Sequence, residues 1–276
     1  VKIHAKDLSM EHLQKGVKKY WIFGNFSSLN HELIPSIVTN LDYSVLEYDY
    51  KYCAWRSPDK CKENSGVSCS CADSIHGKMI STFLYGAKSL WWMSEAQMEH
   101  YHQLFSFLKE KENVVLSSVF DDQYFVLIKS LLEKYHDKKR EGWIVLASNS
   151  WVKGSQAAIT WCQENDKKYE ALWDIPYEQV LEKLAGAEGF VYLPQGGDTC
   201  PRMVSEAKML GCDLVLNENV QHKDELWFDT EDPFDTEAYL YAARDRFWGG
   251  IKSSMEWLPT LSGYTTILNC EKNNYP

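Results

Sequence analysis

The sequence lacks long apolar runs and has no excess of positive charge. None of its hydrophobic stretches approaches the roughly 18–20 residues that cross a bilayer, so we expect no transmembrane segment. The first residues, VKIHAKDLSMEHLQKG, contain no apolar core of the kind found in a secretory signal peptide. The net charge of −10 repels nucleic acid and anionic lipid, which excludes both as expected partners. We therefore expect a cytoplasmic protein that holds any anionic ligand by a local arrangement of groups.

Aromatic residues and cysteines are plentiful by contrast. Most of the 11 Trp and 16 Tyr are expected in protein cores, and a subset could stack on sugar faces at a site. The eight cysteines, in a chain of 276 residues without secretory signals, favour reduced thiols. Four of them, Cys53, Cys61, Cys69 and Cys71, are close in sequence, but the spacing C-x7-C-x7-C-x-C fits no usual zinc pattern. A structural metal, a disulfide and free thiols all stay open, with free thiols as the default.

Short strands alternate with helices along the chain. In the second half, strands are expected at 142–150, 168–175, 189–195 and 212–218, with helices between them. Nearly continuous apolar strands at such spacing predict a parallel, doubly wound α/β sheet. The first half follows the same rhythm less clearly, with strands ending near Gly24 and Asp49 and a capping box at Ser94 and Gln97. Residues 53–77 read as a loop.

These patterns predict two domains and a tail. We expect an N-terminal domain over 1–139, a C-terminal domain over 140–260 and a tail over 261–276. The basic stretch after the helix at 124–136 marks the boundary between the domains. In the tail, YTTILNC predicts a further strand.

The stretch LPQGGDTCPRMVSEAKMLG, residues 193–211, predicts a ligand site. A strand ends here, and ligands of parallel sheets bind at the carboxyl ends of strands. Gly196 and Gly197 let the backbone approach a ligand, and Pro201 starts a helix whose free N–H groups attract phosphate. Asp198 precedes this helix and Glu206 lies within it, and carboxylates bind the vicinal hydroxyls of sugars well. Together these groups predict a nucleotide-sugar site.

A plainer interpretation of the same acids is also open. Asp198 or Thr199 could simply cap the helix, while Glu206 lies on a solvated helix face.

The seven residues between Asp198 and Glu206 resemble the E-x7-E motif of retaining glycosyltransferases with the GT-B fold (glycosyltransferase group 1, family 4-like). The neighbouring stretches VLASNSWVKGSQAAI, LWDIPYEQVLEKLAGAEGFVYLPQ and SLWWMSEAQMEHY resemble elements of that family in the same order, so the resemblance covers roughly residues 85–220. It implies two Rossmann-like domains with parallel sheets facing a cleft, the N-terminal one shortened.

The resemblance also implies roles for particular residues. Lys153 would contact the donor diphosphate and neutralise the leaving group, Asp198 would hold sugar hydroxyls, and Glu206 would hold the ribose diol. No metal and no cofactor would be needed, because a lysine and a helix dipole supply the positive charge. The implied donor-binding set is Ser148, Lys153, Gly154, Trp173, Ile175, Gly196, Gly197, Thr199, Cys200, Pro201, Arg202, Met203 and Glu206.

On the acceptor side the sequence is less specific. Gly24 and Asn25 follow the first strand and either face an acceptor or form a turn. Asp49 and Arg56 either line a cleft or form a surface ion pair.

The implied function is a hexosyltransferase-like enzyme of glycan biosynthesis. It would move a sugar from a nucleotide-diphosphate donor, of the UDP or GDP kind, to an acceptor hydroxyl with retention of configuration.

Three departures from the family pattern support an alternative. Ser148 stands where the family usually has an arginine, Asp198 is shorter than the usual glutamate, and the N-terminal half is short. The alternative is a catalytically weak or inactive GT-B-like binding or scaffold domain of a larger multidomain glycosyltransferase. The tail resembles the opening strand of a GT-A type domain, which predicts a downstream glycosyltransferase domain in the same full-length chain.

Overall fold

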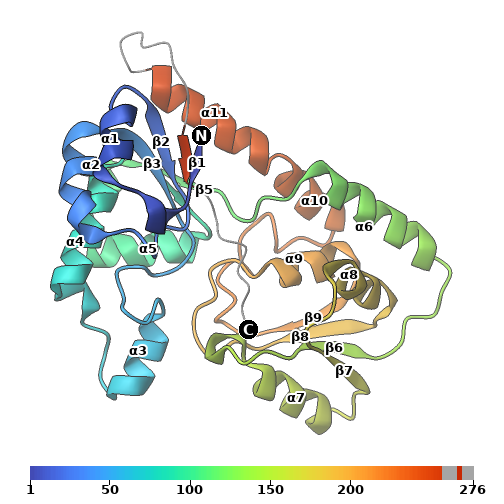
Figure 1. Ribbon diagram of the computed structural model, residues 1–276. Helices are drawn as coiled ribbons and strands as arrows, with labels where there is room; N and C mark the ends of the chain where they lie inside the picture. Colours follow the sequence, from blue (N-terminus) through green and yellow to red (C-terminus); the bar gives the residue numbers. More distant parts are fainter. Residues whose placement is uncertain (257–265, 269–276) are drawn as a thin grey trace. The chain divides into compact units, whose positions relative to one another are not determined.

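The computed structural model describes residues 1–256 and 266–268 (Figure 1). The chain divides into two compact units, one made of Val1–Leu116 with the segment from Asp245 onward, and the other of Ser117–Arg244. Each unit is built on its own sheet, and every strand pair in both sheets is parallel. In the described part of the chain, no helix combines the length and apolar character needed to cross a membrane.

The first unit contains a six-stranded sheet in the order β1-β10-β2-β3-β4-β5. Its strands are β1 (Lys2–Ile3), β2 (Tyr20–Phe23), β3 (Asp42–Glu47), β4 (Ser89–Trp92), β5 (Glu112–Val115) and β10 (Thr266–Leu268). Its helices are α1 (Met10–Gly16), α2 (Ile34–Asn40), α3 (Pro58–Ser65), α4 (Ile75–Gly86), α5 (Glu95–Leu104) and most of α11 (Ala243–Glu256). Short 3₁₀ turns are η1 (Ala5–Asp7), η2 (His31–Leu33), η3 (Cys71–Asp73) and η4 (Ser106–Glu110).

Aromatic side chains fill the core of the first unit. Trp21, Trp91 and Trp92 are each at most 1% exposed, and Phe23 contacts Phe83 edge to face with ring centroids 5.1 Å apart. Large buried rings remove much apolar area from water, which stabilises a compact α/β layer. The expectation that most of the aromatic residues serve cores is confirmed for this unit.

The second unit contains a four-stranded sheet in the order β7-β6-β8-β9. Its strands are β6 (Trp143–Leu146), β7 (Tyr169–Leu172), β8 (Gly189–Tyr192) and β9 (Asp213–Leu216). Its helices are α6 (Asp122–Tyr135), α7 (Ser155–Glu164), α8 (Tyr177–Gly186), α9 (Arg202–Met209) and α10 (Pro233–Tyr241), and η5 (Trp151–Lys153) is a 3₁₀ turn.

Helices cover both faces of the second sheet. Helix α7 lies on one face, and α8 and α9 lie on the other (Figure 1). Val145 and Val191 pack with Ala158 and Cys162 of α7, whereas the alternate strand residues join the larger core formed with α6, α8 and α9. Successive strand residues point to opposite faces, so a strand covered on both sides must be apolar throughout. The predicted doubly wound sheet is confirmed here.

The structure divides the chain at different places from the expected boundaries of 139/140 and 260/261. Helix α6 belongs to the second unit, because its buried residues Phe125, Ile128 and Leu131 pack into the core beside α8. At the other end, α11 returns to the first unit, where Phe247 lies edge-on to Trp91 at 5.0 Å. The apolar face of each helix, and not the basic stretch that follows α6, decides which unit it joins.

Two local expectations are changed by tertiary contacts. Residues 53–77, expected as loop, include helix α3 with Ser57 as its N-cap, as well as η3 and the start of α4. The tail strand is present as Thr266–Leu268, and it lies between β1 and β2 in the sheet of the first unit. The rest of the tail, 261–265 and 269–276, falls outside the described residues.

Candidate functional site

Most of the predicted donor-binding residues lie at the carboxyl edge of the second sheet. The order β7-β6-β8-β9 places the chain's reversal between β6 and β8, because the chain leaves these two strands in opposite directions. Such a switch point is where open α/β sheets bind ligands. The loop after β6 carries Ser148 to Gly154, and the loop after β8 carries Gly196 to Pro201. The two loops that the sequence predicts to bind a ligand are therefore the two that border the switch point.

These two loops are held against each other by backbone contacts. Gly154 adopts φ +63, and a Cβ built on it would lie 1.8 Å from the carbonyl oxygen of Leu193. The N–H of Gln195 donates to the carbonyl of Val152 at 3.0 Å. Glycine is required at 154 both by its left-handed conformation and by this close approach. The position of Lys153, one residue earlier, is fixed by the same contact.

Lys153 and Asp198 meet across the two loops. Lys153 Nζ lies 2.8 Å from Asp198 Oδ2, and Tyr192 at the end of β8 donates its hydroxyl to the same carboxylate oxygen. Burial raises the pKa of Asp198, but Lys153 and Tyr192 outweigh it and hold the pKa below its usual value. Asp198 is therefore an anion at neutral pH, with a cation and a hydroxyl already aimed at it.

Glu206 is buried in helix α9 and has its own partners. Its side chain is 2% exposed, Tyr177 Oη donates to its Oε1 at 2.7 Å, and Arg202 Nε lies 3.8 Å away. Burial raises the pKa of Glu206, and Arg202 and Tyr177 offset only part of this effect. Burial and the nearby charge of Glu206 raise the pKa of Tyr124. The hydroxyl of Tyr124 has no hydrogen-bond partner among the described residues.

These findings contradict the plainer interpretation of the two acids. Glu206 does not lie on a solvated face, and the N-cap of α9 is Pro201, which has no capping side chain, instead of Asp198 or Thr199. Helix α9 starts at Arg202, one residue after the proline expected to begin it. Ala207 in α9 and Leu210 directly after it are fully buried, so one face of this helix packs into the core.

His222 is a site residue that the sequence did not indicate. Its ring is fully buried, stacks on Trp227 with centroids 5.3 Å apart, and neither nitrogen has a hydrogen-bond partner among the described residues. Burial lowers its pKa to about 4, against an opposing effect of the Asp198 charge. The isolated bridge that pairs Asp198 with Val220 brings this histidine to the acid. His222 is thus a neutral imidazole beside the carboxylate.

The remaining donor-set residues take several positions at this edge. Ser148 is engaged within its loop, where its Oγ accepts from the N–H of Ser150 at 3.1 Å. Trp173 is 47% exposed after β7, whereas Ile175 packs against the core. Cys200 Sγ lies 3.4 Å from Ser118 Oγ. The other residues of the donor-binding set differ in burial. The buried ones are Gly196, Thr199 and Pro201, the half-buried ones are Gly197 and Met203, and the exposed one is Arg202.

The predicted acceptor-side residues lie in the first unit. Gly24 and Asn25 follow β2 and Asp49 follows β3, two adjacent parallel strands, so these residues share one edge of the sheet. Asn25 Oδ1 accepts from Ser27 Oγ at 2.9 Å, and the turn that follows is closed by the N–H of Leu29, which donates to the carbonyl of Phe26 at 2.9 Å. Arg56 Nε donates to Asp49 Oδ2 at 2.9 Å, so these two residues form an ion pair, which was one of the two alternatives.

That ion pair is part of a larger, partly buried charge cluster. Lys51, which is 3% exposed, lies 2.9 Å from Glu47 and 3.1 Å from Asp49. Burial raises the pKa of Glu47 to about 7, although Lys51 acts in the opposite direction. Asp49 is therefore anchored from two sides and is not an isolated surface acid.

Three side chains that donate hydrogen bonds to the acids of these sites share a feature of their position in the sequence. Tyr177, Tyr192 and Lys51 each sit within a residue or a few residues of a strand or helix end, where a polar tip can reach the sheet edge. The sequence does not indicate that these side chains donate to Glu206, Asp198 and Glu47.

Comparisons with solved structures show which fold this is. The α,α-trehalose-phosphate synthase (UDP-forming) from Burkholderia vietnamiensis superposes with a TM-score of 0.51 at 10% identity, covering 85% of this chain and 74% of that chain. The corresponding enzyme from Burkholderia xenovorans, in complex with glucose-6-phosphate, gives a TM-score of 0.53 at 8% identity, covering 88% and 75%. No protein-family model matches the chain, and no curated protein matches it in sequence. The likeness establishes the fold, an α/β structure of the GT-B glycosyltransferase type with two Rossmann-like units.

Proposed function

We propose that this protein is a retaining, metal-independent glycosyltransferase whose second unit binds a nucleotide-diphosphate sugar. The observation that carries the proposal is the Lys153–Asp198 pair at the switch point between β6 and β8, directly before helix α9. A cation, a carboxylate and a helix N-terminus at one strand edge suit a ligand that carries both phosphate and hydroxyl groups. The fold shared with UDP-forming synthases supports the same class of donor.

In this proposal each group has one task. Lys153 and the first-turn N–H groups of α9 bind the diphosphate, and Asp198 then accepts hydrogen bonds from sugar hydroxyls. Glu206, positioned by Tyr177, accepts from the ribose diol. Trp173, exposed after β7, stands beside the base. The two ribose hydroxyls would donate to Glu206, whose pKa burial raises and Arg202 and Tyr177 only partly lower.

The chemistry follows from this placement. The bond between the anomeric carbon and the diphosphate oxygen breaks, and the electron pair leaves with the diphosphate, whose charge Lys153 and the dipole of α9 stabilise. The acceptor oxygen bonds to the same face of the anomeric carbon, and its proton passes to the departing phosphate oxygen. Because a lysine already supplies the countercharge, no divalent cation is required at this step. Gly24, Asn25, Asp49 and Arg56 are the proposed acceptor-side residues.

A binding and transfer assay tests the proposal. We expect UDP-glucose to bind in calorimetry and to raise the melting temperature, since a ligand of the native state stabilises it. GDP- and ADP-glucose serve as comparison donors. With glucose-6-phosphate as the first acceptor, because a structural neighbour holds it, NMR of the product should show the donor's anomeric configuration.

The control and the contrary outcomes are specific. Glu206→Ala should lose donor affinity, whereas Glu170→Ala, in a surface pair with Lys183, should not. Donor binding without transfer to any acceptor would favour the scaffold alternative. No binding of any nucleotide sugar would overturn both functions.

A further inference from the structure

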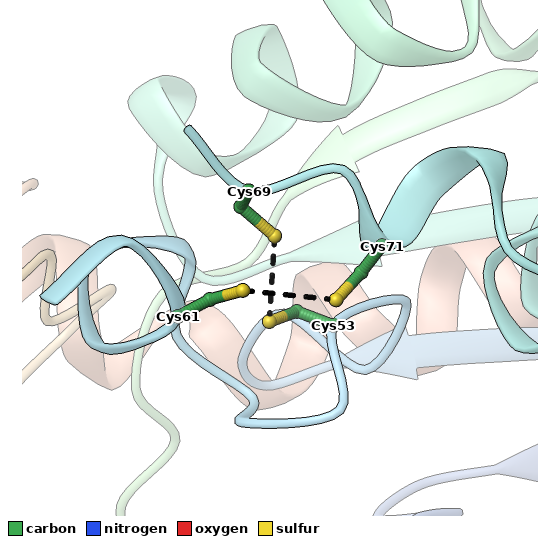
Figure 2. Close-up of side chains that lie close together, drawn as sticks. All are labelled: Cys53, Cys61, Cys69 and Cys71. Atoms are coloured by element: carbon green, nitrogen blue, oxygen red, sulfur yellow. Dashed lines mark hydrogen bonds between the residues drawn. The ribbon is translucent and has the colours of Figure 1, made fainter. Parts of the chain in front are cut away.

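Four cysteines of the first unit converge on one point. Cys53 lies in the turn after β3, Cys61 in α3, Cys69 in the loop that follows, and Cys71 at the start of η3. Their sulfur atoms all lie within 4.8 Å of one another, and Figure 2 shows the four side chains pointing toward a common centre. The spacing C-x7-C-x7-C-x-C did not indicate this, because helix α3 turns the chain back on itself between the first and third cysteines.

The sulfur–sulfur distances match one kind of ligand. Cys53 Sγ lies 3.7 Å from Cys69 Sγ, and Cys61 Sγ lies 3.8 Å from Cys71 Sγ. Four thiolates placed tetrahedrally at the Zn–S bond length stand about 3.8 Å apart. A disulfide requires about 2.0 Å, and none of the seven described cysteines forms one. An iron–sulfur cluster spreads its cysteines over several iron atoms and so separates them further.

The surrounding segment has little else to hold it in place. Between Cys53 and Gly77, the only buried residues are Ser57 and Cys61, and Cys61 is the single buried residue of α3. A stretch of this length with so little apolar burial cannot fix its conformation by a hydrophobic core. Metal ligation supplies stabilisation in small, core-poor segments of this kind.

Backbone features keep two of the cysteines in place. A Cβ on Gly77 would lie 2.2 Å from the carbonyl oxygen of Cys71, so the absence of a side chain lets α4 pack directly on η3. Arg56, between the first two cysteines, has φ +54, which is unfavourable for a residue with a side chain. Such a turn persists only where its surroundings over-determine it.

From these observations we propose that Cys53, Cys61, Cys69 and Cys71 bind a single structural zinc ion as a tetrathiolate. The ion holds together the segment between β3 and α4, which carries all four cysteines. It thereby holds Arg56 in position to pair with Asp49 at the carboxyl edge of the first sheet. The site is distinct from the proposed sugar-transfer residues of the second unit, and it does not depend on the proposed function.

Metal analysis of the full chain tests the zinc site. Protein purified without added metal should contain about one zinc per chain, and X-ray absorption at the zinc edge should show four sulfur ligands at about 2.3 Å. Cys69→Ser, at a half-buried position, should lose the zinc and lower the melting temperature. Cys162→Ala, a buried cysteine in α7, should keep the zinc.

Other outcomes would overturn the proposal. Zinc retained at full stoichiometry in both Cys69→Ser and Cys61→Ser would exclude these sulfurs as ligands. Two disulfides found by mass spectrometry after alkylation without reduction would also contradict it, as would iron with its visible absorption in place of zinc. The absorption measurement is made on the wild-type protein, so it decides the matter even where a variant fails to fold.

Discussion

Lys153 Nζ lies 2.8 Å from Asp198 Oδ2, so the cation proposed to bind the donor diphosphate and the carboxylate proposed to bind the donor sugar are bound to each other. Their side chains are 31% and 14% exposed, which leaves the pair accessible to solvent and ligand. A diphosphate offers Lys153 a more highly charged partner than one carboxylate does. Binding of the donor would therefore release Asp198 to accept hydrogen bonds from the sugar.

Removing the lysine should weaken donor binding. We expect Lys153→Ala to raise the dissociation constant for UDP-glucose roughly 10- to 150-fold, the range for losing one hydrogen bond to a charged group. Calorimetry at fixed ionic strength measures the change. Lys183→Ala, which removes a surface lysine paired with Glu170, is the matched control. Equal affinities for the two variants would show that Lys153 does not contact the donor.

Removing the charge of Glu206 should stabilise the protein and weaken its binding of the donor. Because burial raises the pKa of Glu206, the ionised form is unfavourable in the fold, and stability falls as pH rises from the unfolded pKa of about 4.3 through the raised folded pKa. Glu206→Gln keeps an acceptor for Tyr177 without the charge. We expect a higher melting temperature at pH 7.5, by roughly 2–4 °C for each 1 kcal/mol gained, together with weaker donor binding. A lower melting temperature with unchanged binding would refute both parts.

His222 should make stability depend on pH in a different window. Its folded pKa of about 4 lies below the unfolded value of 6.5, so its stabilising effect is complete above 6.5 and is lost as pH falls toward 4. At pH 5 the loss relative to pH 7.5 is about 2 kcal/mol. Asp198 also has a lowered pKa, and its contribution is lost only below about 3.9.

His222→Phe tests this window while keeping a flat ring against Trp227. Urea unfolding at pH 5.0 and 7.5 should give a smaller difference in the variant than in the wild type. An identical pH dependence in both proteins would mean that another group causes the loss.

The contact at Gly154 predicts a large effect from a single methyl group. Gly154→Ala combines a left-handed φ with a Cβ 1.8 Å from a backbone oxygen that cannot move freely. We expect it to destabilise the protein by about 3 kcal/mol or more and to weaken donor binding. Gly211→Ala in the same unit is the control, since φ is +75 there but the nearest atom, at 3.2 Å, belongs to the flexible side chain of Arg140. Denaturant unfolding should show a clearly smaller loss for Gly211→Ala.

Much of the local structure was determined by the sequence alone. Ser94 and Gln97 predict a capping box, and Ser94 Oγ accepts from the N–H of Gln97 while Gln97 Oε1 accepts from the N–H of Met93. The apolar strands of the second half follow from the sequence in the same way, because strand burial and helix caps depend on residues near in sequence. The local pattern also places Asp198 in the loop after a strand, whereas Lys153 is indicated only by the resemblance to the glycosyltransferase family.

Tertiary structure alone decided which of those residues meet. Lys153 and Asp198 are 45 residues apart, and their pairing depends on β6 and β8 being neighbours in the sheet. His222 is buried beside Asp198 through a strand-like bridge that no local pattern encodes. The four cysteines converge because α3 folds back after β3, which their spacing does not reveal. Sequence specifies which groups each element presents, but only the packing of distant elements brings those groups within bonding distance.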